Sequence, residues 1–137
     1  MVREARDDWW LIGSAAMTLH GARPIEVADI DLLMSRRDAA AVAERLRLTP
    51  SPADENGLFR SDFFTRVPAV PLAIELMAGF HVRVGSAWRE VRPASRQAIQ
   101  VGSALLYVPS VRELIEMGRL FGRPKDRERE ALLLPLL

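Results

Sequence analysis

The sequence predicts an α+β fold, in which helices pack on a mixed β-sheet of about four to six strands. Three observations lead to this prediction. The length of 137 residues suits one domain. A hydrophobic fraction of 49% is enough for a packed core. Helical and strand-like stretches alternate at first and are followed by a run of strands and two helices. We therefore expect residues 1–137 to form one domain that ends in a helical pair over residues 109–137.

Composition and charge exclude several classes of protein. The chain has no cysteine, which rules out disulfides and thiol catalysis. Nineteen basic residues against eighteen acidic ones give a net charge of +1, so there is no general case for nucleic-acid binding. The start, Met1–Asp8, is charged, and the apolar run Trp9–Ile12 is too short for a membrane segment. We expect a cytoplasmic protein without a membrane partner.

The first segments read as a strand followed by a helix. Trp9–Ile12 is a short apolar run that is typical of a buried strand. It ends at Gly13-Ser14, where the Ser14 hydroxyl is placed to cap a helix over Ala15–His20. Gly21 is placed to end that helix.

The next segments repeat this order. Val27–Met34 is predicted to be a strand, and the alanine-rich stretch Asp38–Leu48 a helix. Two prolines, an asparagine and a glycine make Thr49–Gly57 a loop. Leu58–Val67 is then predicted to be a strand.

The remaining strands lie between residues 70 and 108. Val70–Met77 is apolar on both faces, which favours a central strand, and Gly79–Val84 either continues it or forms its neighbour. Ala98–Val101 and Ala104–Val108 are two further β-rich stretches.

Two helices are predicted to close the chain. The first covers Ser110–Phe121, where Ser110 and Glu113 have the spacing of a capping box. Gly122 and Pro124 separate it from a last helix over Lys125–Leu133.

The segment Asp29-Ile30-Asp31 is the strongest chemical feature of the sequence. Side chains alternate along a strand, so Asp29 and Asp31 share one face and Ile30 points to the other. Two carboxylates on one face repel each other unless a cation neutralises them, and oxygen ligands of this kind suit Mg²⁺. The alternative is a solvated strand whose carboxylates pair with arginines.

Two further features could join these aspartates. Gly13 permits close backbone approach at the strand-to-helix turn, and Ser14 can offer its hydroxyl to a phosphate. Glu75 interrupts an apolar strand and needs a partner or a metal. If it joins Asp29 and Asp31, three carboxylates could hold two metal ions, and Glu75 could act as a general base. The alternative for Glu75 is an ion pair with an arginine such as Arg60 or Arg83.

This pattern resembles the nucleotidyltransferase superfamily, which has a polymerase-beta-like fold. The resemblance rests on LIGSAAMTLHGARPIEVADIDLLMS followed by AIELM, within the range Trp9–Met77. It implies transfer of a nucleoside monophosphate from an NTP such as ATP, with Mg²⁺ or Mn²⁺ as cofactor. It also implies that Gly13 and Ser14 contact the triphosphate, that Asp29 and Asp31 bind metal and that Glu75 is the third carboxylate.

The C-terminal part adds to the resemblance. YVPSVRELIEMGRLFGRPKDRERE is similar to the tail of stand-alone bacterial members, including toxins of abortive-infection type. In these relatives an Arg-x-Lys-Asp segment opens the last helix, as Arg123, Lys125 and Asp126 do here. Lys125 is the sole lysine of the chain and can serve as a point charge for phosphate. The alternative is a solvated helix with surface ion pairs.

Two interpretations of function stay open at this point. The first is an active nucleotidyltransferase whose acceptor hydroxyl lies on RNA, a protein or a small molecule. The second is an inactive relative that acts as a binding or regulatory module, within a toxin–antitoxin pair or alone. A homodimer is a further possibility, because the leucine-rich tail over residues 131–137 either packs on the domain or forms a dimer contact.

Overall fold

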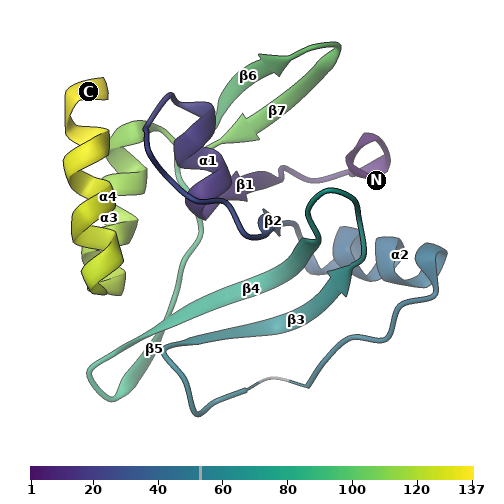
Figure 1. Cartoon of the computed structure of the whole chain (residues 1–137). Coiled ribbons are helices and arrows are strands. Elements are labelled where there is room, and N and C mark those ends of the chain that lie inside the picture. Colours follow the sequence, from purple (N-terminus) through teal and green to yellow (C-terminus); the bar gives the residue numbers. More distant parts are fainter. Residues whose placement is uncertain (53) are drawn as a thin grey trace.

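The computed structural model describes residues 1–52 and 54–137 and confirms an α+β fold (Figure 1). The first half contains β1 (Trp10–Ile12), α1 (Gly13–Leu19), β2 (Ile30–Leu33), α2 (Arg36–Leu46) and β3 (Phe59–Val67). The second half contains β4 (Ile74–Val84), β5 (Ala87–Glu90), β6 (Gln97–Val101), β7 (Ala104–Val108), α3 (Val111–Phe121) and α4 (Pro124–Leu133). Short 3₁₀ turns lie at Val2–Glu4 and Leu134–Leu136.

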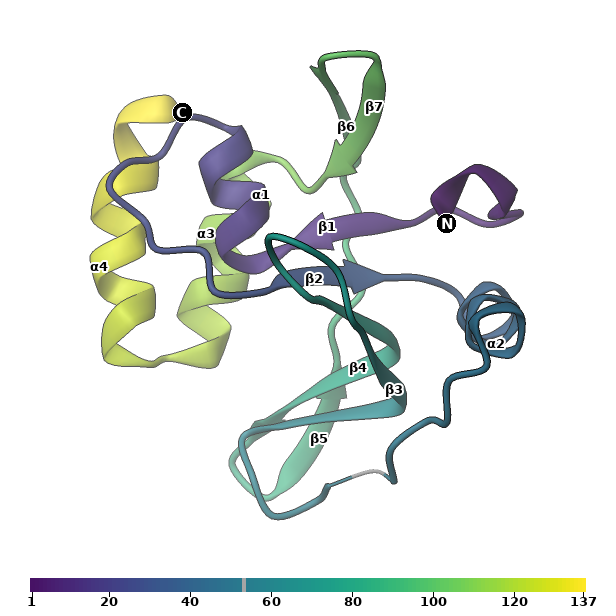
Figure 2. The same cartoon turned by 45° about the vertical axis from the view of Figure 1, so that its right-hand side comes forward.

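The main sheet is mixed and has five strands. Its order is β1-β2-β4-β3, and β5 pairs with β4 beyond the part that pairs with β2. The β2–β4 pair is parallel, and the other pairs of this sheet are antiparallel. Strands β6 and β7 form a separate hairpin that projects from the body of the molecule (Figure 2). The prediction of a central strand is confirmed for β4, which pairs with three others.

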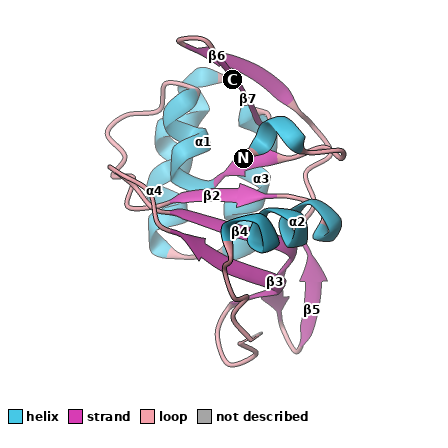
Figure 3. Cartoon of the chain, turned by 90° about the vertical axis from the view of Figure 1, so that its right-hand side faces the viewer, coloured by secondary structure: helices cyan, strands magenta, loops and turns pink. Residues whose placement is uncertain are grey.

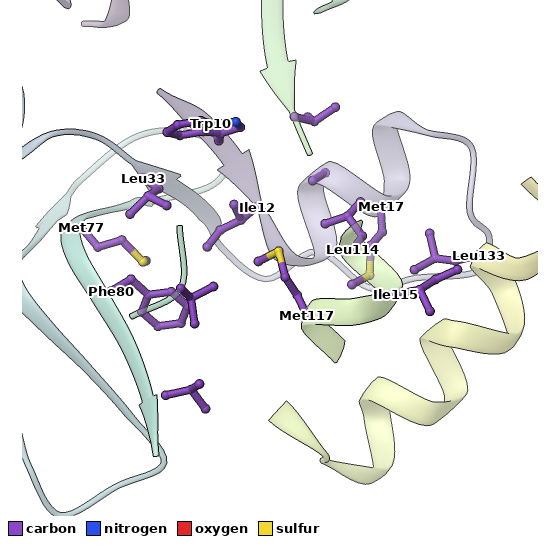
Figure 4. Packing of buried hydrophobic residues seen from close by; sticks show 14 of the residues in the cluster. Trp10, Ile12, Met17, Leu33, Met77, Phe80, Leu114, Ile115, Met117 and Leu133 are labelled. Atoms are coloured by element: carbon purple, nitrogen blue, oxygen red, sulfur yellow. The ribbon is translucent and has the colours of Figure 1, made fainter. Parts of the chain in front are cut away.

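Helices cover both faces of the sheet (Figure 3). Helix α2 packs on one face, where its alanine and valine side chains meet Leu32, Phe63 and Leu76. On the other face α1, α3 and α4 contribute to a larger core with Leu33 and Met77, shown in Figure 4. Leu32, Leu76, Leu114 and Leu133 are among the most deeply buried side chains, so β2, β4, α3 and α4 are each anchored in a core.

Two strands begin later than the sequence predicts. β2 starts at Ile30 instead of Val27, so Asp29 directly precedes the strand. β4 starts at Ile74 instead of Val70, and the side chain of Val70 is 97% exposed. Pro68 and Pro71 lack the N–H that strand pairing needs, which explains why the apolar pattern did not extend the strand. The stretch Gly79–Val84 continues β4.

The predicted helix caps are partly wrong. Ser14 lies inside the first turn of α1, the N-cap is Ile12, and no side chain caps this helix. Ser110 does cap α3 by accepting a hydrogen bond from the Glu113 N–H at 3.1 Å. The Glu113 carboxylate instead accepts hydrogen bonds from the N–H groups of Ala94 and Ser95, at 2.7 and 2.8 Å. This carboxylate therefore ties the segment after β5 to α3.

The regular alternation of β4 breaks at Gly79. Met77 and Phe80 belong to the same core although they are three residues apart, whereas strict alternation would place them on opposite faces. Gly79 has a φ of +61° and faces Asp62 on β3. The resulting bend brings Phe80 onto the face that carries α1 and α3, and so lets β4 contribute both to the core and to the wall of a cleft.

The leucines at the end of α4 and after it pack only in part. Leu133 is buried, whereas Leu134, Leu136 and Leu137 are 46%, 38% and 61% exposed. Within residues 1–52 and 54–137, no helix combines the length and apolar character that crossing a membrane requires.

We predict that Gly79→Ala destabilises the fold much more than Gly85→Ala. Both glycines have a φ near +60°, so either alanine is strained by about 1 kcal/mol. A Cβ on residue 79 would also lie 2.8 Å from the Asp62 Cβ, whereas one on residue 85 would meet nothing within 4 Å. We expect Gly79→Ala to lose roughly 2 kcal/mol more in urea unfolding. Equal losses would contradict the close contact.

Candidate functional site

The sheet places charged residues in one row. Its register aligns Ile12 on β1, Asp31 on β2, Glu75 on β4 and Arg66 on β3. Residues aligned in this way point to the same face of a sheet. The next row on the same face lies two residues away along each strand. It contains Trp10, Leu33, Met77 and Phe64, which belong to the larger core or pack against it. The charged row thus lies directly at the border of the hydrophobic core.

A cleft of about 590 Å³ opens over this row. The residues that the sequence singled out for metal and phosphate binding come from four segments of the chain, yet all of them line this one cleft. They are Gly13, Ser14, Asp29, Asp31, Glu75 and Lys125. Ile30 does not line the cleft, in keeping with the predicted alternation of Asp29 and Asp31.

Gly13 is needed because the chain passes very close to Asp31. Residue 13 follows Ile12, which is the register partner of Asp31. A Cβ on residue 13 would lie 2.8 Å from the Asp31 Oδ2 atom, and the φ of Gly13 is +67°. The absent side chain leaves an open space beside this carboxylate oxygen.

The Asp31 carboxyl group is strongly perturbed. Burial raises the pKa of Asp31 to about 7, and the negative charge and hydrogen bond of the neighbouring Glu75 add to the increase. Asp29 raises this pKa further, whereas the positive charge of Arg123 lowers it. The positive charge near Asp31 is therefore too small to stabilise its ionised form fully near neutral pH.

Arg66 lies between the other two carboxylates. Its Nη2 atom donates to Asp29 Oδ1 at 2.8 Å, and its Nη1 atom donates to Glu75 Oε1 at 3.2 Å. The predicted partners of Glu75 were wrong, since Arg60 and Arg83 contact Glu55, Asp62 and the Trp88 ring instead. The register of the β3–β4 hairpin, which opposes residues 66 and 75, could have identified Arg66.

The donor set suits a divalent cation. It consists of carboxylate oxygens, which hard cations such as Mg²⁺ prefer. The open space beside Asp31 Oδ2 and the guanidinium between Asp29 and Glu75 both fit a position for positive charge. In the described part of the chain, no three acidic or histidine side chains already stand as a ready-made metal site. Binding a metal would therefore require the carboxylates and Arg66 to rearrange.

A basic group of residues lines the cleft near the start of α4. Lys125 joins Arg123 and Arg129 there, and it makes none of the hydrogen bonds or ion pairs found among residues 1–52 and 54–137. Arg123 is held in place, because its Nε donates to Asp126 Oδ2 at 2.8 Å and its Nη2 to Asp126 Oδ1 at 3.0 Å. The cleft thus contains a fixed and a free cation close to the carboxylates.

Aromatic residues that the sequence did not single out line the same cleft. The ring of Phe121 on α3 lies 4.9 Å from that of Phe59 and 6.0 Å from that of Phe80. The Arg123 guanidinium lies 4.9 Å from the Phe59 ring centre. These contacts join α3 and α4 to the sheet beside Asp29, Asp31 and Glu75, which we call the acidic row. Phe59 and Phe80 lie on strands, where aromatic residues are common, so their residue type alone gives no signal of a binding role.

Comparison with known proteins identifies the fold. No family model matches the sequence, and no curated protein does. Among solved structures, the chain is similar to a Thermotoga maritima protein provisionally described as a nucleotidyltransferase. The TM-score is 0.73 at 17% identity, over 98% of this chain and 86% of the other.

Two antibiotic-modifying enzymes show the same likeness. The lincosamide adenylyltransferase LnuA, solved with lincomycin, gives a TM-score of 0.59 at 10% identity, over 95% of this chain and 87% of that one. ANT(2")-Ia, solved with adenylyl-2"-tobramycin, gives a TM-score of 0.55 at 13% identity, over 93% of this chain and 78% of that one. The chain therefore has the nucleotidyltransferase fold that its motifs predicted.

We predict that Asp31→Asn stabilises the metal-free protein in a pH-dependent way. The folded state holds the Asp31 proton more tightly than the unfolded state, whose pKa is near 3.8, so the wild type loses stability as the pH rises from about 4 to about 7. Above pH 7 the difference stays constant, at no more than about 4 kcal/mol. Urea unfolding in EDTA at pH 4, 5.5 and 8 measures this difference. A gain that is the same at every pH would contradict it.

Proposed function

We propose that the protein is a metal-dependent nucleotidyltransferase that moves a nucleoside monophosphate from an NTP, such as ATP, to a hydroxyl group. The observation that carries this proposal is the single cleft that brings together the acidic row, Gly13-Ser14 and Lys125. The nucleotidyltransferase fold supports it, as do one structural neighbour named as an adenylyltransferase and another solved with an adenylylated antibiotic. The fold alone would not define the chemistry, so the proposal depends on these side chains.

In this reaction the acceptor oxygen attacks the α-phosphorus of the NTP. A bond forms between that oxygen and phosphorus, and the bond from the α-phosphorus to the oxygen that bridges to the β-phosphate breaks, so that pyrophosphate leaves. Divalent cations held by Asp29, Asp31 and Glu75 would neutralise the phosphate charge. Glu75 is also the candidate base for the hydroxyl proton.

The remaining residues of the cleft would position the nucleotide. Ser14 and Lys125 line the cleft, and their side chains have no partner among the described hydrogen bonds, so both are available to phosphate oxygens. Arg123 is held by Asp126 and adds a fixed positive charge. Since little covalent chemistry falls to the protein, these residues would act mainly by positioning and charge neutralisation.

The acceptor is RNA, a protein or a small molecule. LnuA was solved with lincomycin and ANT(2")-Ia with adenylyl-2"-tobramycin, and a small hydroxyl compound is one class that this cleft could take. A second candidate function is an inactive binding or regulatory module, for example within a toxin–antitoxin pair. The Arg66 bridge favours that candidate, because it already neutralises Asp29 and Glu75.

Mg²⁺-dependent nucleotide binding is the first test of the proposed nucleotidyltransferase site. We predict that the wild type binds at least one of ATP, GTP, CTP and UTP in titration calorimetry, and that binding requires Mg²⁺. The double variant Asp29→Asn, Asp31→Asn should lose the Mg²⁺-dependent part, because it removes ionised metal ligands. Circular dichroism and urea unfolding check that the variant is folded. Binding that is equally strong in EDTA, or no binding by the folded wild type, would contradict the proposal.

We predict a separate role for Lys125 in holding phosphate. Lys125→Met should weaken Mg²⁺–nucleotide binding by about tenfold, which is the usual size of one charged hydrogen bond. Arg127→Met is the matched control, because Arg127 is exposed on the same helix and does not line the cleft. Equal effects of the two substitutions in the same calorimetric titration would mean that only overall charge matters.

A further inference from the structure

We propose that Arg66 is a tethered counter-ion that occupies the cation position of the acidic row and must leave it when a divalent metal binds. This inference rests on the proposed function, and it adds a positioning residue that neither the sequence motif nor the fold indicated. Arg66 competes with the metal, and so it sets how strongly the empty site attracts one.

The sheet itself directs Arg66 to this place. Arg66 on β3 is the register partner of Glu75 on β4, and Glu75 is in turn the register partner of Asp31 on β2. Because β4 lies between β2 and β3, the guanidinium reaches across β4 to contact Asp29 beside β2. The planar guanidinium has separate terminal nitrogens, so this one side chain donates to both carboxylates at once.

The form of the contact makes Arg66 easy to displace. Each carboxylate receives only one nitrogen, at 2.8 and 3.2 Å, whereas the strongest arginine–carboxylate pairs use two parallel hydrogen bonds. The Arg66 side chain is 56% exposed, so water can solvate its guanidinium when it leaves the carboxylates. Arg123 provides the contrast, since it donates two hydrogen bonds to the nearly fully buried Asp126.

The bridge also leaves the acidic row incompletely neutralised. Arg66 contacts Asp29 and Glu75, and the ion pairs found among the described residues include none to Asp31. Arg66 therefore forms ion pairs with two of the three carboxylates, and Asp31 has none among the described residues. A divalent cation carries twice the charge in a smaller volume and can contact several carboxylate oxygens directly. We expect metal binding to be favoured by Asp31 and opposed by the two ion pairs of Arg66.

Two linked effects follow from this competition. Removing Arg66 should strengthen metal binding, because no ion pair has to break first. The same change should destabilise the metal-free protein, because it leaves Asp29 and Glu75 without their counter-charge. Since binding and the Arg66 position are coupled, the two effects must have a common origin, and added metal should restore the lost stability.

The test measures Mn²⁺ binding without nucleotide, by the electron paramagnetic resonance signal of the free ion. Arg66→Met should bind Mn²⁺ roughly tenfold more tightly than the wild type, within the usual range of such coupling. The control is Arg119→Met, which removes an equally exposed arginine that pairs with Glu130 and does not line the cleft. Arg66→Lys keeps the charge with a shorter reach, and we expect it to give an intermediate affinity.

Urea unfolding supplies a second readout. In EDTA, Arg66→Met should be less stable than the wild type, and Mn²⁺ should remove that difference. If Arg66→Met binds Mn²⁺ no more tightly than the wild type and Arg119→Met, while Asp31→Asn still abolishes binding, the Arg66 proposal is overturned and the metal site stands. If no folded variant binds Mn²⁺, both the Arg66 proposal and the metal-dependent function are overturned.

Discussion

The parallel pairing of β2 with β4 determines the chemistry of this molecule. It makes Asp31 the register partner of Glu75, and Asp29 lies two residues before Asp31. These carboxylates are half-buried, so their like charges repel strongly. Three neighbouring features are related to this repulsion. Asp31 retains its proton more readily, the Arg66 guanidinium neutralises the two outer carboxylates, and the glycine at position 13 leaves an oxygen of Asp31 accessible.

The same sheet that builds the site also builds the core. On the face covered by α1 and α3, a row with Trp10 and Met77 belongs to the larger core, and the next row is charged. The rigid core therefore holds the carboxylates in a fixed order, while their repulsion lowers the stability of the fold. Such a local cost is common where binding is the reason for the arrangement. The bend at Gly79 brings Phe80 to the wall of the cleft, which Phe59 and Phe121 also line.

Much of the fold could be predicted from the sequence, because apolar periodicity reports directly on burial. The two aspartates and Glu75 were identified because carboxylates do not suit apolar strands. The Gly-Ser turn and Lys125 were identified from their places at helix starts and from the family resemblance. The register between strands was beyond such patterns, and that is why Arg66 was missed and Glu75 was assigned other partners. The start of β4 was also placed too early, since apolar residues between prolines look like a strand although they are exposed. Contacts across the sheet depend on tertiary structure, which no local pattern contains.

The central claim is that the three carboxylates of the acidic row form a divalent-cation site within the nucleotidyltransferase fold. A crystal structure of the wild type with Mn²⁺ and a non-hydrolysable NTP analogue tests it most directly, because Mn²⁺ gives an anomalous signal. We expect an anomalous peak in direct contact with oxygens of Asp29 and Asp31, the phosphates next to Ser14 and Lys125, and Arg66 moved away from Asp29. Nucleotide bound elsewhere, or a row without an anomalous peak and with the Arg66 bridge intact, would contradict the claim.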